Sequence, residues 1–264
     1  MRKYLEVFKW SFKMQIVWRF DVAMTMLATI SRILAAWLLW KAVFTGRESV
    51  SGFTFEGMLS YYIISSFLVS LDMSNQISWE VSYLIRDGGF SKHMVTPMNP
   101  FSFFSFMVAG ESAFHLAFSA MAAFVCVVLF RVNILFTTNI LEIIYALALI
   151  ILGLFFMMCF QYLLGILTFK FLSVHSIIFI ANHIIAFMTG ALVPLALLPG
   201  GILKVMRIFP FYYVTYLPAM LLGGRCGDEA LAGIIILVCW IAGFLVLNKL
   251  VYDKLRMKYA GVGI

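Results

Sequence analysis

The sequence predicts an all-α integral membrane protein with six transmembrane helices, and three observations support this architecture. First, 64% of the 264 residues are hydrophobic and only 12% are charged, whereas a soluble domain is nearer half apolar and a quarter charged. Second, six apolar stretches reach about 20 residues, the length with which a helix crosses a bilayer. Third, the basic residues are unevenly distributed among the segments that connect these stretches.

The segment before the first apolar stretch, residues 1–19, predicts an amphipathic helix. Its apolar residues recur at helical spacing, and its charged residues fall on another face: Leu5, Phe8, Phe12 and Ile16 against Arg2, Glu6, Lys9 and Lys13. A basic amphipathic helix beside a membrane lies in the plane of the interface. We therefore expect an elbow that leads into the first span. The alternative is a positively charged anchor without a functional role.

The six predicted spans follow one another with no low-complexity linker between them. They cover residues 21–43, 57–79, 102–130, 140–168, 174–195 and 230–251. The third and fourth are longer than a bilayer requires, so we expect them to tilt or to project beyond it. No fixed-period repeat and no second domain is evident, which predicts a single transmembrane domain over residues 1–264.

The orientation follows from lysine and arginine, which concentrate on the cytoplasmic side of membrane proteins. With the N-terminus inside, twelve of them face the cytoplasm, while Arg32 and Lys41 lie in the first span. The outside group has five members: Arg47, Arg131, Lys204, Arg207 and Arg225. We therefore expect both termini inside the cell. The net charge of +7 is explained by these anchors, so no nucleic-acid partner is expected.

The cytoplasmic connection, residues 80–100, combines a broken helix with candidate exposed groups. Gly88 and Gly89 allow positive φ and are expected to end the helix. Phe90 and Met94 follow as exposed apolar candidates, which fits docking to a soluble partner; the alternative is an ordinary loop. The docking candidates are Tyr83, Leu84, Ile85, Arg86, Asp87, Gly88, Gly89, Phe90 and Met94.

The outer connection is almost wholly apolar, yet residues 190–224 contain four prolines and five glycines. Proline lacks an amide donor and fixes φ, so a straight spanning helix cannot pass through this segment. Irregular backbone at membrane depth survives only when it is buried in protein or lines a cavity. We therefore predict re-entrant-like half-helices over residues 190–229. The outer-gate candidates are Gly190, Pro194, Pro199, Pro210, Phe211, Tyr213 and Pro218.

Polar and ionisable residues also occur within the spans: Arg32, Asp72, Glu111, His115, Asn182 and His183. A charged residue at the bilayer centre costs roughly 2.5–3.5 kcal/mol on insertion scales. Glu111 and His115 are four positions apart and share a helix face. The group fits either a substrate or proton path, or a hydrogen-bond network that holds the bundle together. Arg32 is a candidate partner for Asp72 or Glu111.

Sequence motifs for catalysis are missing. The chain has no GxxxxGK[ST] phosphate loop, no HExxH motif and no GxSxG turn. The four cysteines show no CxxC spacing, and the four histidines do not cluster along the sequence. We therefore expect neither an enzyme active site nor a metal site, and no cofactor bound by this chain.

Taken together, these features resemble the permeases of type-2 ABC transporters across the whole chain. The charged-Gly-Gly turn before Pro97 and Pro100 is similar to the first cytoplasmic connection of that family, and residues 190–224 are similar to its outer element. The basic C-terminal tail, with Tyr259 and Gly263, resembles the family's tail. One departure is that residues 90–96 carry Lys92 and His93 where such permeases often show an apolar run.

This resemblance implies a permease subunit of an ATP-binding cassette exporter in a bacterial-type cytoplasmic membrane. A cytosolic ABC ATPase dimer would hold ATP and Mg, and a second permease, identical or not, would complete the path. Spans one and five would face that second permease, with Asn182 and His183 satisfied across the interface. The alternative is an ion- or proton-coupled secondary transporter or channel, although secondary transporters usually show an internal repeat. A third possibility, an intramembrane enzyme, lacks its motifs.

Overall fold

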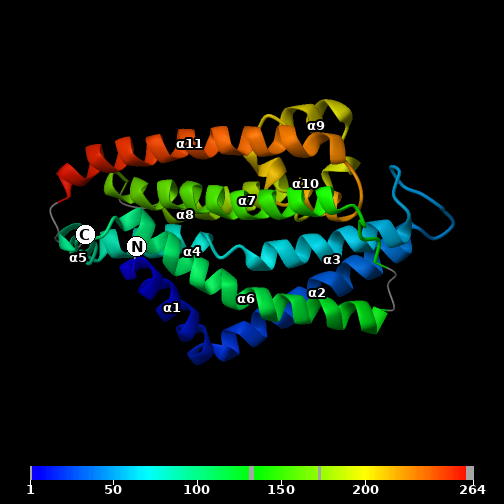
Figure 1. Cartoon of the computed structure of the whole chain (residues 1–264), viewed down its shortest axis with the longest axis horizontal. Coiled ribbons are helices and arrows are strands. Elements are labelled where there is room, and N and C mark those ends of the chain that lie inside the picture. Colours follow the sequence, from blue (N-terminus) through cyan, green and yellow to red (C-terminus); the bar gives the residue numbers. More distant parts are fainter. Residues whose placement is uncertain (1, 131–133, 172–173, 260–264) are drawn as a thin grey trace.

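The computed structural model describes residues 2–130, 134–171 and 174–259, and these residues form helices joined by short connections. Two residues of the sequence predictions, Arg131 and Gly263, lie outside the described residues. The long helices run roughly along one axis, and the start of α1 (Arg2–Val17) lies at the same end of the molecule as the C-terminal end of α11 (Ala230–Leu255) and α5 (Ser91–Val95) (Figure 1).

Four helices of the described chain are long and apolar enough to cross a membrane, or five if one bent pair counts as a span. The four are α2 (Arg19–Val43), α6 (Pro100–Phe130), α7 (Ile140–Ile166) and α11 (Ala230–Leu255). They coincide with the first, third, fourth and sixth predicted spans. The 31 residues of α6 extend for about 46 Å, well beyond a hydrocarbon core of about 30 Å, as the length of this apolar stretch predicts.

The second predicted span is broken. The prediction of one helix over residues 57–79 is wrong, because α3 (Phe55–Leu71) ends and α4 (Asn75–Arg86) starts after a short gap. In that gap the carboxylate of Asp72 accepts the backbone N–H of Ser74 at 3.0 Å. A short polar side chain of this kind competes with the helical backbone for its own amides and favours a helix start.

The fifth predicted span is shorter than expected, because α8 (His175–Met188) has only 14 residues. The apolar sequence continues to residue 195, but Gly190 adopts φ +74°. The carbonyl oxygen of Gly190 accepts a hydrogen bond from the Tyr61 hydroxyl at 2.8 Å. A Cβ on residue 190 would lie 2.8 Å from that hydroxyl oxygen of Tyr61. Only glycine satisfies both the backbone angle and this close approach.

The outer connection forms the predicted half-helices, with two pieces bent by 90° to one another. Its elements are η2 (Leu195–Leu197), α9 (Gly200–Met206), η3 (Pro210–Tyr213), α10 (Tyr216–Leu222) and η4 (Gly227–Glu229). The prolines fix the starts of these elements: Pro194 and Pro199 precede η2 and α9, Pro210 opens η3, and Pro218 lies in the first turn of α10. Proline is tolerated there because the first-turn amides have no intrahelical partner.

The N-terminal elbow is present as α1 (Arg2–Val17), which meets α2 at an angle and runs alongside the first half of α6 (Figure 1). The two helices pack closely, since a Cβ on Gly110 of α6 would lie 2.4 Å from the carbonyl oxygen of Phe8. The rings of Tyr4 and Phe106 stack at 5.5 Å, and Phe12 meets Phe114 edge-on at 5.3 Å. The elbow is therefore packed onto the bundle.

Candidate functional site

The coupling segment, residues 80–100, folds back onto the helix bundle through Phe90. This side chain is fully buried, and its ring lies 5.2 Å from Phe169, 6.4 Å from Tyr252 and 6.5 Å from Phe104. The expectation that Phe90 is exposed is therefore wrong. The turn at Gly88 (φ +82°) reverses the chain and directs Phe90 inward, where its large apolar ring leaves water.

The remaining docking candidates separate into a buried and an exposed group. Ile85 is 1% exposed and packs inward, so it is not available to a partner, while Leu84, Arg86, Gly88, Gly89 and Met94 are partly buried. Tyr83 is 62% exposed and Asp87 is exposed. Sequence analysis missed Val95, which is 84% exposed at the end of α5. The exposed residues form what we call the docking surface: Tyr83, Asp87, Ser91, Lys92 and Val95.

Arg86 serves a contact within the chain. Its Nη1 lies 2.6 Å from Nε2 of His175, the first residue of α8, and the His175 ring lies 5.1 Å from that of Trp79. The end of α4 is thereby tied to the start of α8. The sequence offers no signal for this pairing beyond a cation and a histidine on the same side of the membrane.

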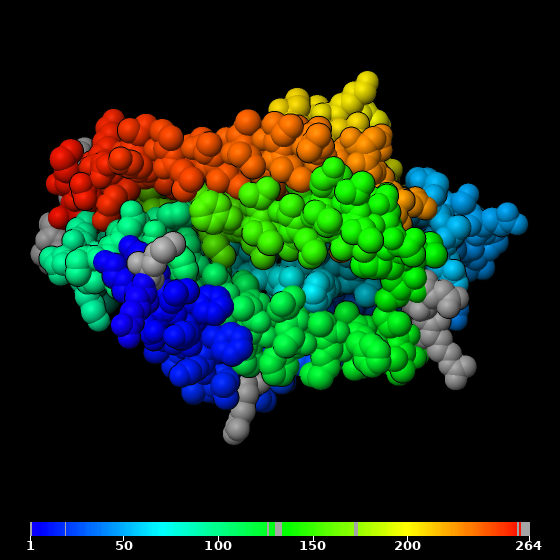
Figure 2. All heavy atoms as spheres, viewed as in Figure 1, coloured from blue at the N-terminus to red at the C-terminus, as the bar shows by residue number. Residues whose placement is uncertain are grey.

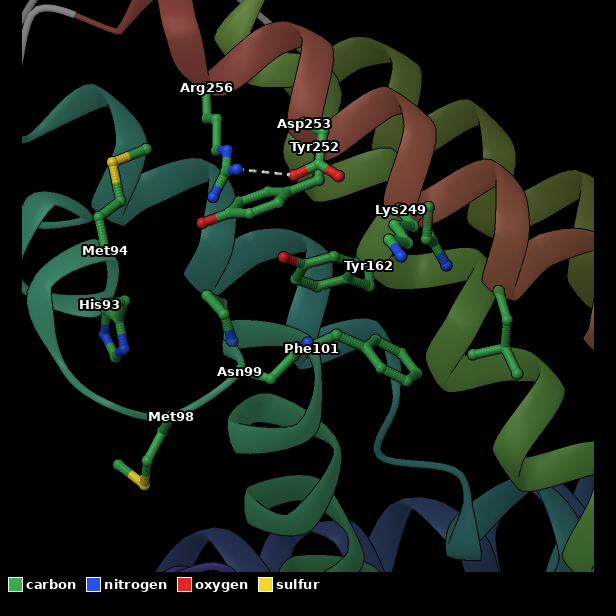
Figure 3. A pocket seen from close by; sticks show the side chains of 13 residues that line it. His93, Met94, Met98, Asn99, Phe101, Tyr162, Lys249, Tyr252, Asp253 and Arg256 are labelled. Carbon is green, nitrogen blue, oxygen red and sulfur yellow. Dashed lines mark ion pairs between the residues drawn. The ribbon is translucent and has the colours of Figure 1, made fainter.

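A cavity of about 510 Å³, which we call the coupling cavity, lies between α5, the start of α6, α7 and α11 (Figure 3). Lys249, Tyr252 and Asp253 of α11 line one side together with Arg256 of η5 (Arg256–Lys258), and Tyr162 of α7 lies below them. Arg256 pairs with Asp253 at 3.0 Å. The other lining residues include Pro100 and Phe101 at the start of α6 and His93 and Met94 of α5.

Some polar atoms of this cavity have hydrogen-bond partners within the described chain and others have none. Asn248 is 4% exposed; its Nδ2 donates to the Cys159 carbonyl at 2.9 Å, and its Oδ1 has no partner in the described structure. Burial, with the charge of Lys92 adding, lowers the pKa of His93, which keeps its ring neutral at pH 7. The positive charge of the cavity therefore comes from Lys249 and from Arg256, which Asp253 partly balances.

The C-terminal tail packs beside the aromatic residues that surround Phe90. Tyr259 meets the ring of Phe169 edge-on at 5.3 Å, and η5 (Arg256–Lys258) continues α11 toward the coupling segment. Phe169 in turn contacts Phe90. The tail tyrosine singled out by sequence therefore belongs to the aromatic cluster beneath the docking surface.

Within the bundle, Glu111 joins the elbow to α6. Its side chain is buried, and Ser11 of α1 donates a hydrogen bond to its Oε1 at 3.2 Å. His115 is buried one turn further along α6, where its carbonyl accepts the Ser119 hydroxyl at 2.6 Å. The Ser11–Glu111 bond joins two helices and supports the structural alternative, a hydrogen-bond network that holds the bundle together, whereas the Ser119–His115 bond lies within α6.

The other intramembrane candidates do not join this network. Arg32 is exposed on α2 and, in the described structure, makes no ion pair with Asp72 or Glu111. Asn182 has a partner within the chain, because Gln161 of α7 donates to its Oδ1 at 2.7 Å; its contact with a second permease stays a prediction. Gln161 is almost fully buried, and nothing in the local sequence marked it as this partner. His183 is exposed, with Nδ1 2.9 Å from the Phe179 carbonyl.

The second part of the outer segment, η3 and α10, is buried in the protein, as the rule for irregular backbone requires, whereas α9 has no buried residue. Residues 210–222 are buried throughout, so the outer-gate candidates Pro210, Phe211, Tyr213 and Pro218 face protein, and Pro199 is exposed. Tyrosine hydroxyls satisfy carbonyls where the helices break: Tyr61 to Gly190, Tyr62 to Leu192 at 3.1 Å, and Tyr213 to Arg207 at 2.6 Å.

The carboxylate of Glu229 connects the end of the outer segment to α9 and η3. Glu229 accepts hydrogen bonds from Arg207 at 2.6 Å and from Tyr212 at 2.9 Å. Among the residues that the structure places, no three His, Cys, Asp or Glu side chains come together as a metal site would require.

Comparison with known proteins gives one match. The sequence model of the family described as "ABC-2 family transporter protein" matches residues 30–263. No curated protein and no solved structure matches the chain.

Proposed function

Because this chain belongs to the ABC-2 family of transporter proteins, we propose that it is the permease subunit of an ATP-binding cassette exporter. The family is a membrane transport component that is not itself catalytic, and membership implies association with an ABC ATPase. The apolar helices and the family together indicate a multi-pass membrane protein. In this proposal the cytoplasmic membrane of the cell holds the chain, and the ATPase dimer holds ATP and Mg.

The packing of the coupling segment carries this proposal. The docking surface lies on a short, exposed turn-and-helix unit at the end of the molecule that holds the start of α1 and the C-terminal end of α11 (Figure 1). Phe90 joins that unit to residues of α6 and α11 and to Phe169, which directly follows α7. Protein interiors are densely packed and transmit strain. A displacement of the docking surface by an ATPase would therefore move several long helices together.

An alternating path also needs a second permease, and the exposure of Arg32 supports one. Arg32 lies in the middle of α2, and its side chain is exposed. A cation facing lipid at mid-span is costly, and such residues normally face the bundle interior or water. A second subunit against α2 would remove Arg32 from lipid. This arrangement also fits exposed His183 on α8. The ion-coupled alternative would require Asp72 and Glu111 to act together, and they are engaged separately by Ser74 and Ser11.

The proposed topology has six crossings with both termini in the cytoplasm. The broken pair α3 and α4 forms the second crossing, and α8 with the start of the outer segment forms the fifth. The shared location of the start of α1 and the C-terminal end of α11 supports an even number of crossings (Figure 1). Four described members of the outside group would then face the outside: Arg47, Lys204, Arg207 and Arg225.

Cysteine labelling tests this orientation. In intact cells, a membrane-impermeant thiol reagent should modify a Lys204→Cys variant, because Lys204 is exposed on α9. A Lys92→Cys variant, exposed on α5, should react only after the cells are opened. Both variants are compared in a background without the partly exposed Cys226 and the exposed Cys239. The opposite pattern, with Lys92→Cys labelled in intact cells, would invert the topology.

Copurification tests the partner. The wild-type chain, purified in mild detergent, should retain a P-loop ATPase. The double variant Tyr83→Ala, Asp87→Ala should weaken this retention about tenfold or more, because an exposed aromatic residue at an interface centre often dominates binding. Arg86→Ala is a poor probe, since it also breaks the contact with His175.

The matched control is Glu48→Ala, an exposed site in the loop before α3, which should leave retention unchanged. If no ATPase copurifies with the wild type under any condition, the permease assignment loses its basis. If the ATPase copurifies equally with the double variant, the docking surface lies elsewhere.

A further inference from the structure

A second, apolar depression lies next to the coupling cavity along α6 and α7, with the ring of Phe101 between the two. This depression, which we call the α6–α7 groove, has a volume of about 540 Å³ and is lined almost wholly by apolar atoms. Residues of α6 and α7 form its walls, and the buried Leu71 of α3 contributes to its lining. Figure 2 shows α6 and α7 on the facing side of the molecule, with atoms of α3 visible between them.

The residue spacing shows that cavity and groove share one face of each helix. On α6, Phe101 of the cavity is followed by Ser105, Ala109, Ser112 and Leu116 of the groove. On α7, Tyr162 of the cavity continues as Met158, Phe155, Ile151 and Leu147 of the groove. Residues three and four apart lie on one helix face. Phe101 stands at the junction, 5.3 Å from Tyr162 and 6.1 Å from Phe155.

The two ends of this combined site have opposite chemistry. The cavity end contains Lys249, which is exposed and makes no ion pair within the described structure. It also contains the buried Asn248 with its unpartnered Oδ1. The groove end offers side chains such as Ile151, which is 67% exposed. A cation and a hydrogen-bond acceptor therefore lie at one end of an open apolar track.

The dimensions match one leaflet of a bilayer. From Met158 to Leu147 the groove follows twelve residues of α7, whose eleven steps span about 17 Å at the helical rise. Half of a hydrocarbon core is about 15 Å thick. The charged end lies at the level of the coupling segment and the C-terminal end of α11 (Figure 1), where a headgroup would be placed.

We propose that the coupling cavity and the α6–α7 groove together bind one anionic phospholipid. Lys249 contacts the phosphate, Asn248 Oδ1 accepts a headgroup hydroxyl, and an acyl chain occupies the groove beside Ala109 and Ala113. Basic pockets between membrane helices on the cytoplasmic side are suited to anionic headgroups. This inference goes beyond the proposed transport function, because it requires only that the chain lies in a bilayer. The lipid would then bridge α11 and the start of α6, next to the coupling turn.

The test uses the full-length protein, purified in detergent and stripped of lipid. Dioleoyl phosphatidylglycerol should raise its melting temperature and appear as a bound mass by native mass spectrometry. Lys249→Gln should weaken this binding about fivefold, because one cation near a membrane surface contributes about that factor. Ala113→Trp should block the acyl chain and abolish the bound mass. Both variants keep the docking surface intact, so retention of the ATPase reports separately on the proposed function.

The matched control is Lys254→Gln, which removes an exposed lysine from the same helix end but outside the cavity. It should bind phosphatidylglycerol as the wild type does. Dioleoyl phosphatidylcholine has acyl chains but no net negative charge, and inorganic phosphate is an anion without an acyl chain. Both should bind weakly or not at all. Equal losses in the two lysine variants would overturn the proposal, as would stabilisation by phosphate alone. So would an Ala113→Trp variant that loses dimers and retains lipid, because the groove would then be an interface between copies. If Ala113→Trp fails to fold, the two lysine variants still decide the matter.

Discussion

Replacing Phe90 with alanine is expected to lower the free energy of unfolding by about 3–5 kcal/mol, the usual cost of deleting a fully buried phenyl ring. The loss should be at the upper end, because the cavity would open among three aromatic neighbours that belong to different elements. Thermal unfolding in detergent measures the effect. The coupling turn should also loosen, so that ATP hydrolysis by a bound ATPase continues without transport.

The exposed Tyr83 provides the matched control for this prediction. Tyr83→Ala removes an aromatic ring from the same segment, but the ring is 62% exposed, so stability should change by less than about 0.5 kcal/mol. Phe90→Leu should recover part of the loss, because it restores most of the apolar volume. If Phe90→Ala and Tyr83→Ala unfold at the same temperature, the aromatic cluster does not anchor the coupling segment.

Introducing a single methyl group at Gly110 should displace the elbow helix. A Cβ there would lie 2.4 Å from the carbonyl oxygen of Phe8 and 3.2 Å from the backbone nitrogen of Phe12, and neither backbone atom can rotate away. Overpacking of this kind costs typically 1–3 kcal/mol. The displacement also separates Ser11 from Glu111, which would leave a buried carboxyl group with neither oxygen bonded.

The control for Gly110→Ala is Gly243→Ala in α11, where a Cβ would meet nothing within 4 Å. Alanine is the better helix former, so this control should be neutral or slightly stabilising. A disulfide cross-link between cysteines placed at Phe12 and Phe114, whose rings are 5.3 Å apart, reports elbow position. The cross-link should form in the Gly243→Ala background and fail in the Gly110→Ala background. Equal cross-linking in both would show that α1 tolerates the added methyl group.

Much of the candidate site could be located from sequence, but its inward and outward faces could not. The glycines after Arg86 correctly marked the end of α4, and two of the docking candidates, Tyr83 and Asp87, are exposed. Phe90 was assigned to the wrong side because it follows a glycine turn, and the direction of the chain after such a turn depends on what it packs against. Val95 was missed for the same reason.

The sequence by itself determined the membrane class, the long helices and the broken outer segment. These depend on local chemistry: apolar length sets what can span a bilayer, and proline and glycine set where a helix must stop. The position of Gly190 and the clustered prolines were sufficient to exclude a straight helix there. The uneven distribution of lysine and arginine was likewise visible without any structure.

Only the tertiary structure decided which side chains meet. Ser11 and Glu111 are 100 positions apart, and Gln161 and Asn182 are 21 apart, so no local pattern could pair them. In a soluble protein an apolar stripe at least indicates the buried face of a helix. In a membrane, lipid tails are as apolar as leucine, so lipid-facing and core-facing side chains have the same composition. The hydrophobic pattern therefore predicted that these helices lie in a bilayer, whereas packing alone determined which of their faces touch each other.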